Sequence, residues 1–316
     1  MEVLLVLQKI LSMFLIIFVG FFAYKLKWFS KESEKHLTTL MVNVSAPCLV
    51  FASMAGQDRN PLMMGKAVQT IWFMVAVLVL FSVLAIFIVK ALKAPKEDRC
   101  IYRMLIPFSN CGFMGYPLAE AAFGEEGLFL MIIANLSFCI VLFSLGSFLM
   151  IYDQNVNFSL KELLKKIISI PLISCVLGLV IFFTNIRFPV MLSDTMSMLG
   201  SMTAPLSMLI VGIQLCQSSV SRIIHNHRLA IVTAIRLVAV PAATFLFLRW
   251  VPVDPMVFCT VTFALCMPAA AFTAVLAVMY DRNTVLTAEG IFLSNLFALL
   301  TIPVFAMILN AWLLHV

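Results

Sequence analysis

Charge is what this sequence has least of. Lys, Arg, Asp and Glu make up 11% of its 316 residues, against about 25% in an ordinary globular protein. Hydrophobic residues make up 63%, which is more apolar surface than a water-soluble fold can bury. The net charge of +6 sits in short connectors between apolar runs rather than on one basic face, so it does not indicate a nucleic-acid partner. The composition argues against a soluble enzyme, a secreted disulfide protein and a disordered scaffold, and it indicates that lipid surrounds most of the chain.

Motifs for metal or redox chemistry are also missing. None of the eight cysteines belongs to a C-x-x-C pair, and the four histidines stand at the ends of apolar runs. Zinc and thiol redox sites require such spacings. An intramembrane enzyme would need a His-Asp, Ser-Lys or H-E-x-x-H grouping inside an apolar run, and the sequence has none. We therefore expect no metal, no cofactor and no catalytic activity.

Long apolar runs dominate what is present. A bilayer core of about 30 Å needs about 20 apolar helical residues, and ten runs meet this requirement. They are 5–24, 37–56, 67–89, 104–123, 127–151, 167–186, 195–217, 229–250, 256–280 and 290–314. Alternate connectors then carry 15 and 5 of the 21 Lys and Arg residues, and the richer side is the cytoplasmic one. The sequence predicts an all-α polytopic protein of the cytoplasmic (inner or plasma) membrane, with ten transmembrane helices and both termini outside.

The two halves of the chain resemble each other at a constant displacement of 158 residues. The matching positions are Gly20 with Gly178, Pro47 with Pro205, and Leu118 with Leu276. We expect a first five-helix repeat in 1–155, a cytoplasmic linker in 156–166 and a second five-helix repeat in 167–316. Because five is odd, the second repeat enters the membrane from the opposite side. Such inverted repeats are typical of secondary transporters, whose binding site lies where the repeats meet.

Helix-breaking residues gather in the fourth and ninth apolar runs. The fourth contains Asn110, Gly112 and Pro117, and Pro268 in the ninth is displaced by 158 from Asn110. This pattern predicts two discontinuous helices whose exposed N-terminal ends favour an anion. The alternative is that the small residues only allow close packing and the prolines only kink their helices. The expected positions of helix breaks or of the crossover are Pro47, Pro117, Pro205 and Pro268.

Polar residues inside the apolar runs are the candidate substrate-binding groups. Arg236 is the basic residue placed well inside a run; it either extends to the cytoplasmic surface or attracts an anionic substrate. The complete candidate set is Asn110, Ser109, Gly112, Asn43, Gln214, Thr273, Asn295 and Arg236.

Four segments carry a resemblance to a known family. They are 20–51 (GFFAYKLKWFSKESEKHLTTLMVNVSAPCLVF), 109–128 (SNCGFMGYPLAEAAFGEEGL), 200–215 (GSMTAPLSMLIVGIQL) and 266–283 (CMPAAAFTAVLAVMYDRN). In their order and spacing the chain resembles the auxin efflux carrier family, in its short bacterial form. The chain lacks the long central loop of the plant exporters, so regulation by phosphorylation of that loop does not carry over.

The resemblance implies a scaffold part, a transport part, and fourth and ninth helices that are broken and cross in the middle of the membrane. It implies organic-anion substrates, namely auxin in plants and dicarboxylates such as malate and malonate among bacterial members. It further implies that Asn110 contacts the substrate carboxylate, that Pro268 breaks the partner helix, and that Pro47 and Pro205 shape the helices lining the site.

The function expected from these observations is secondary transport of small organic anions, either auxin-like monocarboxylates or dicarboxylates, by alternating access. Two alternatives remain open: a sodium- or proton-coupled transporter of the related bile-acid or antiporter type, and a membrane sensor that binds a metabolite without moving it. The expected partners are the anion and membrane lipid, without nucleic acid, and a homodimer is left open.

Overall fold

A computed structural model describes residues 2–56, 61–152, 170–184, 186, 188–217 and 226–315 of the protein. The linker expected at 156–166 lies outside these residues. All regular elements in the described part are helices, apart from one isolated bridge between Ser109 and Ala269. The all-α prediction is therefore confirmed for the described residues.

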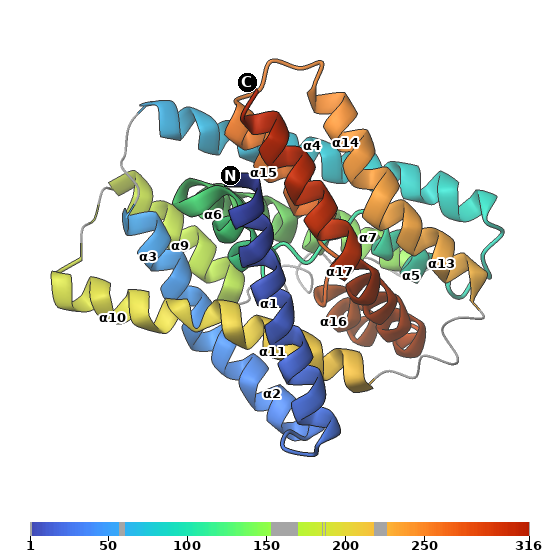
Figure 1. The fold of residues 1–316 in the computed structure, drawn as a ribbon. Coiled ribbons are helices and arrows are strands. Elements are labelled where there is room, and N and C mark those ends of the chain that lie inside the picture. Colours follow the sequence, from blue (N-terminus) through green and yellow to red (C-terminus); the bar gives the residue numbers. More distant parts are fainter. Residues whose placement is uncertain are drawn as a thin grey trace.

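Figure 1 shows the helices in their order along the chain. In the first half they are α1 (Glu2–Lys25), α2 (Lys31–Leu40), η1 (Met41–Ser45), α3 (Ala46–Gly56), α4 (Pro61–Ala91), α5 (Arg99–Leu105), α6 (Gly115–Val141), η2 (Leu142–Gly146) and α7 (Ser147–Ile151). In the second half they are α9 (Ile170–Thr184), α10 (Val190–Ser201), α11 (Thr203–Gln217), α13 (His227–Ala234), η3 (Ile235–Ala239), α14 (Val240–Leu248), α15 (Pro255–Cys266), α16 (Phe272–Met279) and α17 (Thr284–Leu313).

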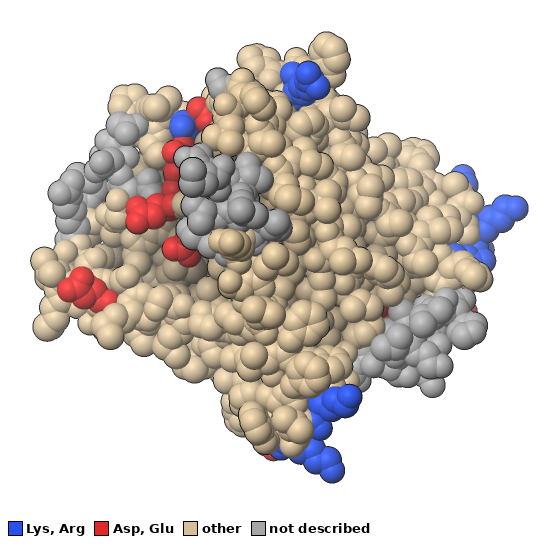
Figure 2. All heavy atoms as spheres, viewed as in Figure 1, with Lys and Arg blue, Asp and Glu red and all other residues tan. Residues whose placement is uncertain are grey.

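Six helices in the described residues are long and apolar enough to cross a bilayer. They are Glu32–Gly56, Pro61–Ala91, Gly115–Ile151, Val190–Cys216, His227–Leu248 and Thr284–Leu313, and shorter apolar helices occupy Leu11–Lys25, Ile173–Thr184 and Pro255–Cys266. Large apolar side chains such as Leu15, Phe22 and Trp72 are exposed on their outer surfaces. In the view of Figure 2 a broad central and right-hand face carries no charged side chains, Lys and Arg lie mainly near the outline, and Asp and Glu lie toward the left. This surface suits a lipid environment.

Two of the long helices contain a short π-helical turn just before a proline. The turn η1 precedes Pro47 in α3, and the turn η3 precedes Pro241 in α14. In each, the residue before the proline donates to a carbonyl five residues back, from Ala46 to Met41 and from Val240 to Ile235. A proline offers no N–H to the ladder, so a locally widened turn keeps the neighbouring carbonyl groups bonded.

The helices form two groups. In one group α1 packs on α11, and α3 packs on α9 and α10; in the other, α6 and α15 pack on each other and on α4, while α17 covers α15. Figure 1 shows the first group at the lower left, in blue and yellow, and α4, α14 and α17 of the second group above and to the right. Contacts of α1 with α6 and α17, and of α3 and α9 with α6, join the groups.

Close helix contacts in the first group rely on glycine. A Cβ on Gly20 of α1 would meet the backbone of Leu209 in α11, and a Cβ on Gly212 of α11 would meet the backbone of Ile17 in α1. A Cβ on Gly178 in α9 would meet side-chain atoms of Val50 and Met54 in α3. These helices therefore approach each other more closely than any larger residue would allow.

Candidate functional site

Two helices of the second group are interrupted. The helix that begins with α5 stops at Leu105, and helical structure resumes at Gly115 in α6. The helix that begins with α15 stops at Cys266 and resumes at Phe272 in α16. Met267 has an extended backbone conformation, with ψ of 150°, because the residue before a proline is disfavoured in the helical region. Pro117 lies in the first turn of α6, where its missing N–H breaks no helical hydrogen bond.

The two interruptions cross and bond to each other. The backbone N–H of Asn110 donates to the carbonyl of Pro268 at 2.8 Å, and that of Ala270 donates to the carbonyl of Phe108 at 3.0 Å. These bonds form the antiparallel bridge between Ser109 and Ala269. Each unwound segment thus satisfies backbone groups of the other, as burial away from water requires. The N-terminal ends of α6 and α16 and the C-terminal ends of α5 and α15 meet at this crossing.

Two side chains from other helices complete the crossing. The hydroxyl oxygen of Ser294 in α17 accepts from the N–H of Ala269 at 3.0 Å. The guanidinium of Arg236 in η3 is fully buried and donates to the carbonyls of Ile106 (3.0 Å), Pro107 (3.3 Å) and Met267 (3.0 and 3.2 Å). Arg236 therefore ties together the C-terminal ends of both interrupted helices and does not extend to the cytoplasmic surface.

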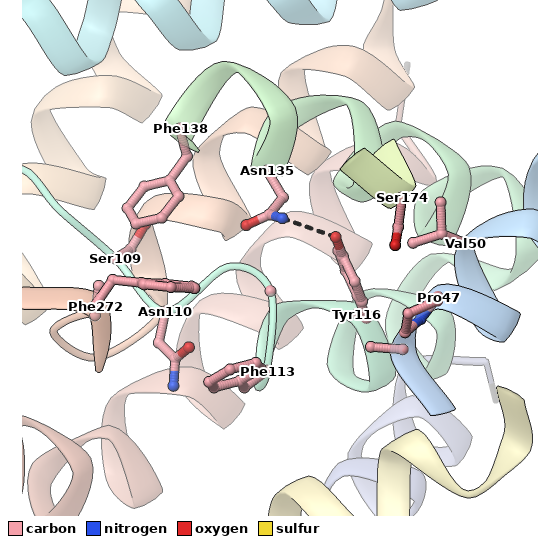
Figure 3. A pocket seen from close by; sticks show the side chains of 13 residues that line it. Pro47, Val50, Ser109, Asn110, Phe113, Tyr116, Asn135, Phe138, Ser174 and Phe272 are labelled. Atoms are coloured by element: carbon pink, nitrogen blue, oxygen red, sulfur yellow. Dashed lines mark hydrogen bonds between the residues drawn. The ribbon is translucent and has the colours of Figure 1, made fainter. Parts of the chain in front are cut away.

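A pocket lies between the crossing and the first group of helices (Figure 3). Its wall consists of Ala46, Pro47 and Val50 from α3, Ser174 from α9, Ser109, Asn110, Gly112 and Phe113 from the first interruption, Tyr116, Asn135 and Phe138 from α6, and Ala270 and Phe272 from the second interruption and α16. Both helix groups and both interruptions therefore contribute to one cavity.

The side of the pocket formed by α6 contains a hydrogen-bonded polar chain. The side-chain amide of Asn135 donates to the hydroxyl of Tyr116 at 2.8 Å (Figure 3). The Asn135 side-chain oxygen accepts from the thiol of Cys111 at 3.3 Å. A Cβ on Gly112 would lie 3.1 Å from the Asn135 oxygen, so glycine there leaves room for this amide. The Tyr116 hydroxyl oxygen accepts a hydrogen bond from the Asn135 amide. The other partner of this hydroxyl in the described structure is the sulfur of Cys175 at 3.8 Å, where either atom can donate. This hydroxyl can therefore donate to a ligand in the pocket.

Aromatic rings form the opposite side. The rings of Phe113 and Phe272 lie 6.0 Å apart and are tilted by 30°, and the Asn110 side chain extends beside Phe113 (Figure 3). No Lys, Arg, His, Asp or Glu stands among the described lining residues. The cavity volume is about 20 Å³, about enough for one water molecule. The pocket is thus small and apolar, with a few amide and hydroxyl groups.

Four of the residues predicted from the sequence line this pocket: Asn110, Ser109, Gly112 and Pro47. Pro268 bonds to Asn110 at the crossing. Thr273 and Asn295 are buried, and the hydroxyl of Thr273 and the side-chain oxygen of Asn295 have no hydrogen-bond partner within the described residues. Neither lines the pocket.

Three other predicted residues lie elsewhere. Asn43 is exposed in η1, and Pro205 is exposed in the first turn of α11. The amide of Gln214 donates to the carboxylate of Glu34 in α2 at 2.9 Å. Helical position alone did not indicate which face of a lipid-embedded helix these residues occupy.

Sequence reasoning did not single out Tyr116, Phe113 or Phe272 as lining residues. All three flank the predicted helix breaks, so adjacency to Asn110 and Pro268 was the available signal. In a chain with 28 Phe residues, an aromatic residue on its own gives no such signal.

Comparison with known proteins agrees with the geometry. A family model described as a membrane transport protein matches residues 5–158 and again residues 153–306. The chain is 24% identical to an uncharacterized transporter of Methanocaldococcus jannaschii over 96% of its own length and 98% of that protein. It is 22% identical to an uncharacterized transporter of Methanothermobacter thermautotrophicus over the same shares of the two chains. The protein is therefore a multi-pass membrane permease that belongs to the membrane transport protein family, the auxin efflux carriers.

Proposed function

We propose that this protein is a secondary transporter that moves small organic anions across the cytoplasmic membrane by alternating access. The observation that carries the proposal is the pocket containing Asn110 at the crossing of two interrupted helices. At such crossings the N-terminal ends of half-helices present unpaired N–H groups and a positive dipole end to an anionic substrate. The N-terminal ends of α6 and α16 lie at this crossing. Their first-turn N–H groups, such as those of Gly115 and Thr273, already bond to carbonyls, so the attraction we propose comes from the positive dipole ends.

The proposed architecture has ten spans in two oppositely oriented repeats of five, with both termini outside. Two hydrogen bonds support it. Ser45 and Thr203 are separated by 158 residues, the displacement of the repeat, and their hydroxyls bond at 2.6 Å. Asn110 and Pro268, separated by the same displacement, bond through their backbones. Equivalent residues of two repeats touch each other only on the axis that relates the repeats, so such an axis would pass through both contacts.

Equivalent helix contacts add to this support. Gly20 in α1 meets α11, and Gly178, its counterpart at a displacement of 158, lies in α9 and meets α3. At this displacement α9 corresponds to α1 and α3 corresponds to α11. The contact of α1 with α11 therefore has its counterpart in the contact of α9 with α3, as expected of two repeats that pack on each other. The family model also matches the chain twice.

The lining favours a substrate with one carboxylate and an apolar body. Asn110, Asn135 and Tyr116 can position a single anionic group, while Phe113 and Phe272 suit an apolar or aromatic remainder. A dicarboxylate such as malate would place a second charge against the apolar wall, and burying an unpaired charge is costly. We therefore place apolar monocarboxylates ahead of malate and malonate as substrates.

Movement between the two helix groups would open the site. The pocket is bounded by α3 and α9 on one side and by the crossing on the other, and it is too small for an organic anion as it stands. Displacement of the crossing relative to α3 and α9 would widen the pocket and expose it to one side of the membrane at a time. This motion is alternating access in its ordinary form.

The test is uptake by proteoliposomes of a radiolabelled aromatic monocarboxylate such as phenylacetate, in competition with unlabelled phenylacetate, phenylacetamide or malonate. We expect phenylacetate to compete best and the uncharged amide, which has the same shape, not to compete. A hydrogen bond to a charged group contributes about 1.5–3 kcal/mol, so Asn110→Ala should weaken the apparent affinity about tenfold to a hundredfold.

The matched control is Asn310→Ala, because the Asn310 amide bonds within its own helix, to the Ala306 carbonyl at 2.9 Å. It should transport like the wild type. Equal competition by malonate and phenylacetate would refute the substrate class, and wild-type affinity in Asn110→Ala would remove Asn110 from the site. Absence of saturable uptake of every carboxylate would contradict the transport proposal itself.

A further inference from the structure

Within the described residues, the buried charge of Arg236 has no acidic partner. Its side chain is fully buried, and its four hydrogen bonds go to three backbone carbonyls. The ion pairs found among the described residues join Lys66 to Glu126 and to Asp254, and do not include Arg236. Buried arginines are normally paired with a carboxylate because desolvation of an unpaired charge is costly. The hydrogen bonds described for this charge all go to backbone carbonyl dipoles.

These carbonyls belong to one kind of structure. Ile106 and Pro107 directly follow the C-terminal end of α5, and Met267 directly follows the C-terminal end of α15. The C-terminal end of a helix carries a partial negative charge. In transporters with interrupted helices, unwound backbone carbonyls and half-helix C-terminal ends coordinate the coupling ion, Na⁺ or H⁺. The guanidinium of Arg236 therefore occupies the kind of position that a coupling cation takes.

We propose that Arg236 is a covalently attached substitute for a coupling cation: it permanently fills the cation-coordinating carbonyls of the crossing, so the carrier works without sodium. Arginine fits this role because its guanidinium stays protonated and directs several donors in a fixed geometry. The partial negative charges of the two C-terminal ends would otherwise repel an anion. The guanidinium, which lies outside the pocket, neutralises them. Arg236 is a positioning residue, because it contacts the backbone of the crossing and does not line the pocket.

The proposal has a direct consequence for ion dependence. A resident cation cannot be exchanged, so sodium should neither stabilise the wild-type protein nor be needed for transport. Removing the side chain should leave a carbonyl-lined position that a free cation can enter. The consequence for transport rests on the proposed function above, but the consequence for stability does not.

The experiment measures the thermal unfolding of purified protein without any carboxylate, in sodium, choline or guanidinium chloride at equal, millimolar concentration. The wild type should unfold at the same temperature in all three. Arg236→Ala should unfold several degrees lower in choline and recover part of that loss in sodium or guanidinium. Arg236→Lys should retain sodium insensitivity, because an ammonium still fills the position. Arg249→Ala, which changes an exposed arginine beyond the end of α14, is the matched control and should behave as the wild type.

Specific stabilisation of the wild type by sodium over choline would overturn the proposal. So would an Arg236→Ala protein that folds but responds alike to all three cations, because a purely structural loss is not repaired by a small ion. If Arg236→Ala does not fold, the wild-type and Arg236→Lys measurements decide: sodium stabilisation of either refutes the inference. Absence of carboxylate transport alongside the expected cation pattern would refute the transport function and leave the role of Arg236 standing.

Discussion

Replacing Gly212 with alanine tests how tightly the first helix group is held together. The added Cβ would lie against the carbonyl oxygen of Ile17 and 2.8 Å from the backbone nitrogen of Phe21, both in α1. Ordinary Cβ contacts begin at 3.4 Å. Both neighbours are backbone atoms, which cannot rotate away as a side chain can. Helices α1 and α11 would therefore have to move apart by at least 0.6 Å, the difference between 2.8 and 3.4 Å.

The expected cost follows from this displacement. Overpacking a well-packed interior costs about 1–3 kcal/mol, and the rigid neighbours place Gly212→Ala near the upper end, at about 3 kcal/mol. With about 2–4 °C per kcal/mol for a chain of this size class, the unfolding temperature should fall by about 6–12 °C. The assay is thermal unfolding of the purified protein in detergent, followed by intrinsic fluorescence or by retention of the monodisperse peak.

Two other glycines provide the comparison. Gly65→Ala in α4 has no atom within 4 Å of the new Cβ and should unfold at or slightly above the wild-type temperature, since alanine favours helix over glycine. Gly178→Ala should be intermediate, because its Cβ would meet side-chain atoms of Val50 at 2.8 Å and Met54 at 3.0 Å, which can shift. A Gly212→Ala protein as stable as Gly65→Ala would refute the close backbone contact and the reasoning built on it.

Two further substitutions address the site. Tyr116→Phe removes the hydroxyl that accepts from Asn135 and that can donate to the ligand. The affinity for phenylacetate in the uptake assay should fall several-fold, and the loss of the acceptor of the buried Asn135 amide should cost about 1–3 kcal/mol of stability. Unchanged affinity would place Tyr116 outside the site. Ser294→Ala leaves the buried N–H of Ala269 without its acceptor, which should cost about 1–3 kcal/mol of stability. Ser294→Thr keeps the hydroxyl and should recover most of the lost unfolding temperature. An equal loss in both variants would contradict the assigned role of this bond.

The sequence was most informative where backbone chemistry decides the structure. Proline lacks an N–H and restricts the residue before it, so Pro268 and the Asn-Gly-Pro cluster of residues 110–117 predicted interruptions, and the structure has interruptions at residues 106–114 and 267–271. The displacement of 158 residues between Asn110 and Pro268 predicted that the two breaks correspond, and the two residues are bonded to each other.

The side chains that line the pocket were harder to predict, because orientation depends on the packing of neighbouring helices. In a soluble protein a polar residue marks the outer face of a helix, but in lipid both the outer face and the interior are apolar. Asn43 was expected to face the interior and is exposed, whereas Asn135 is buried beside the pocket. Arg236 could equally have extended toward water; only the positions of the carbonyls of Ile106 and Met267 indicate why it is buried.

The two sides of the crossing differ in their backbone hydrogen bonds. Asn110 and Pro268 occupy corresponding positions, and the N–H of Asn110 donates to the carbonyl of Pro268 at 2.8 Å. Proline cannot return that bond, so the carbonyl of Asn110 instead accepts from Gly115 and so anchors the start of α6. The backbone of Asn110 is thus held by bonds to Pro268 and to Gly115, and under the proposed function its side-chain amide contacts the ligand. A symmetric pair of asparagines would exchange two backbone bonds and present two amides; the asymmetric pair presents one, which matches a substrate with a single carboxylate.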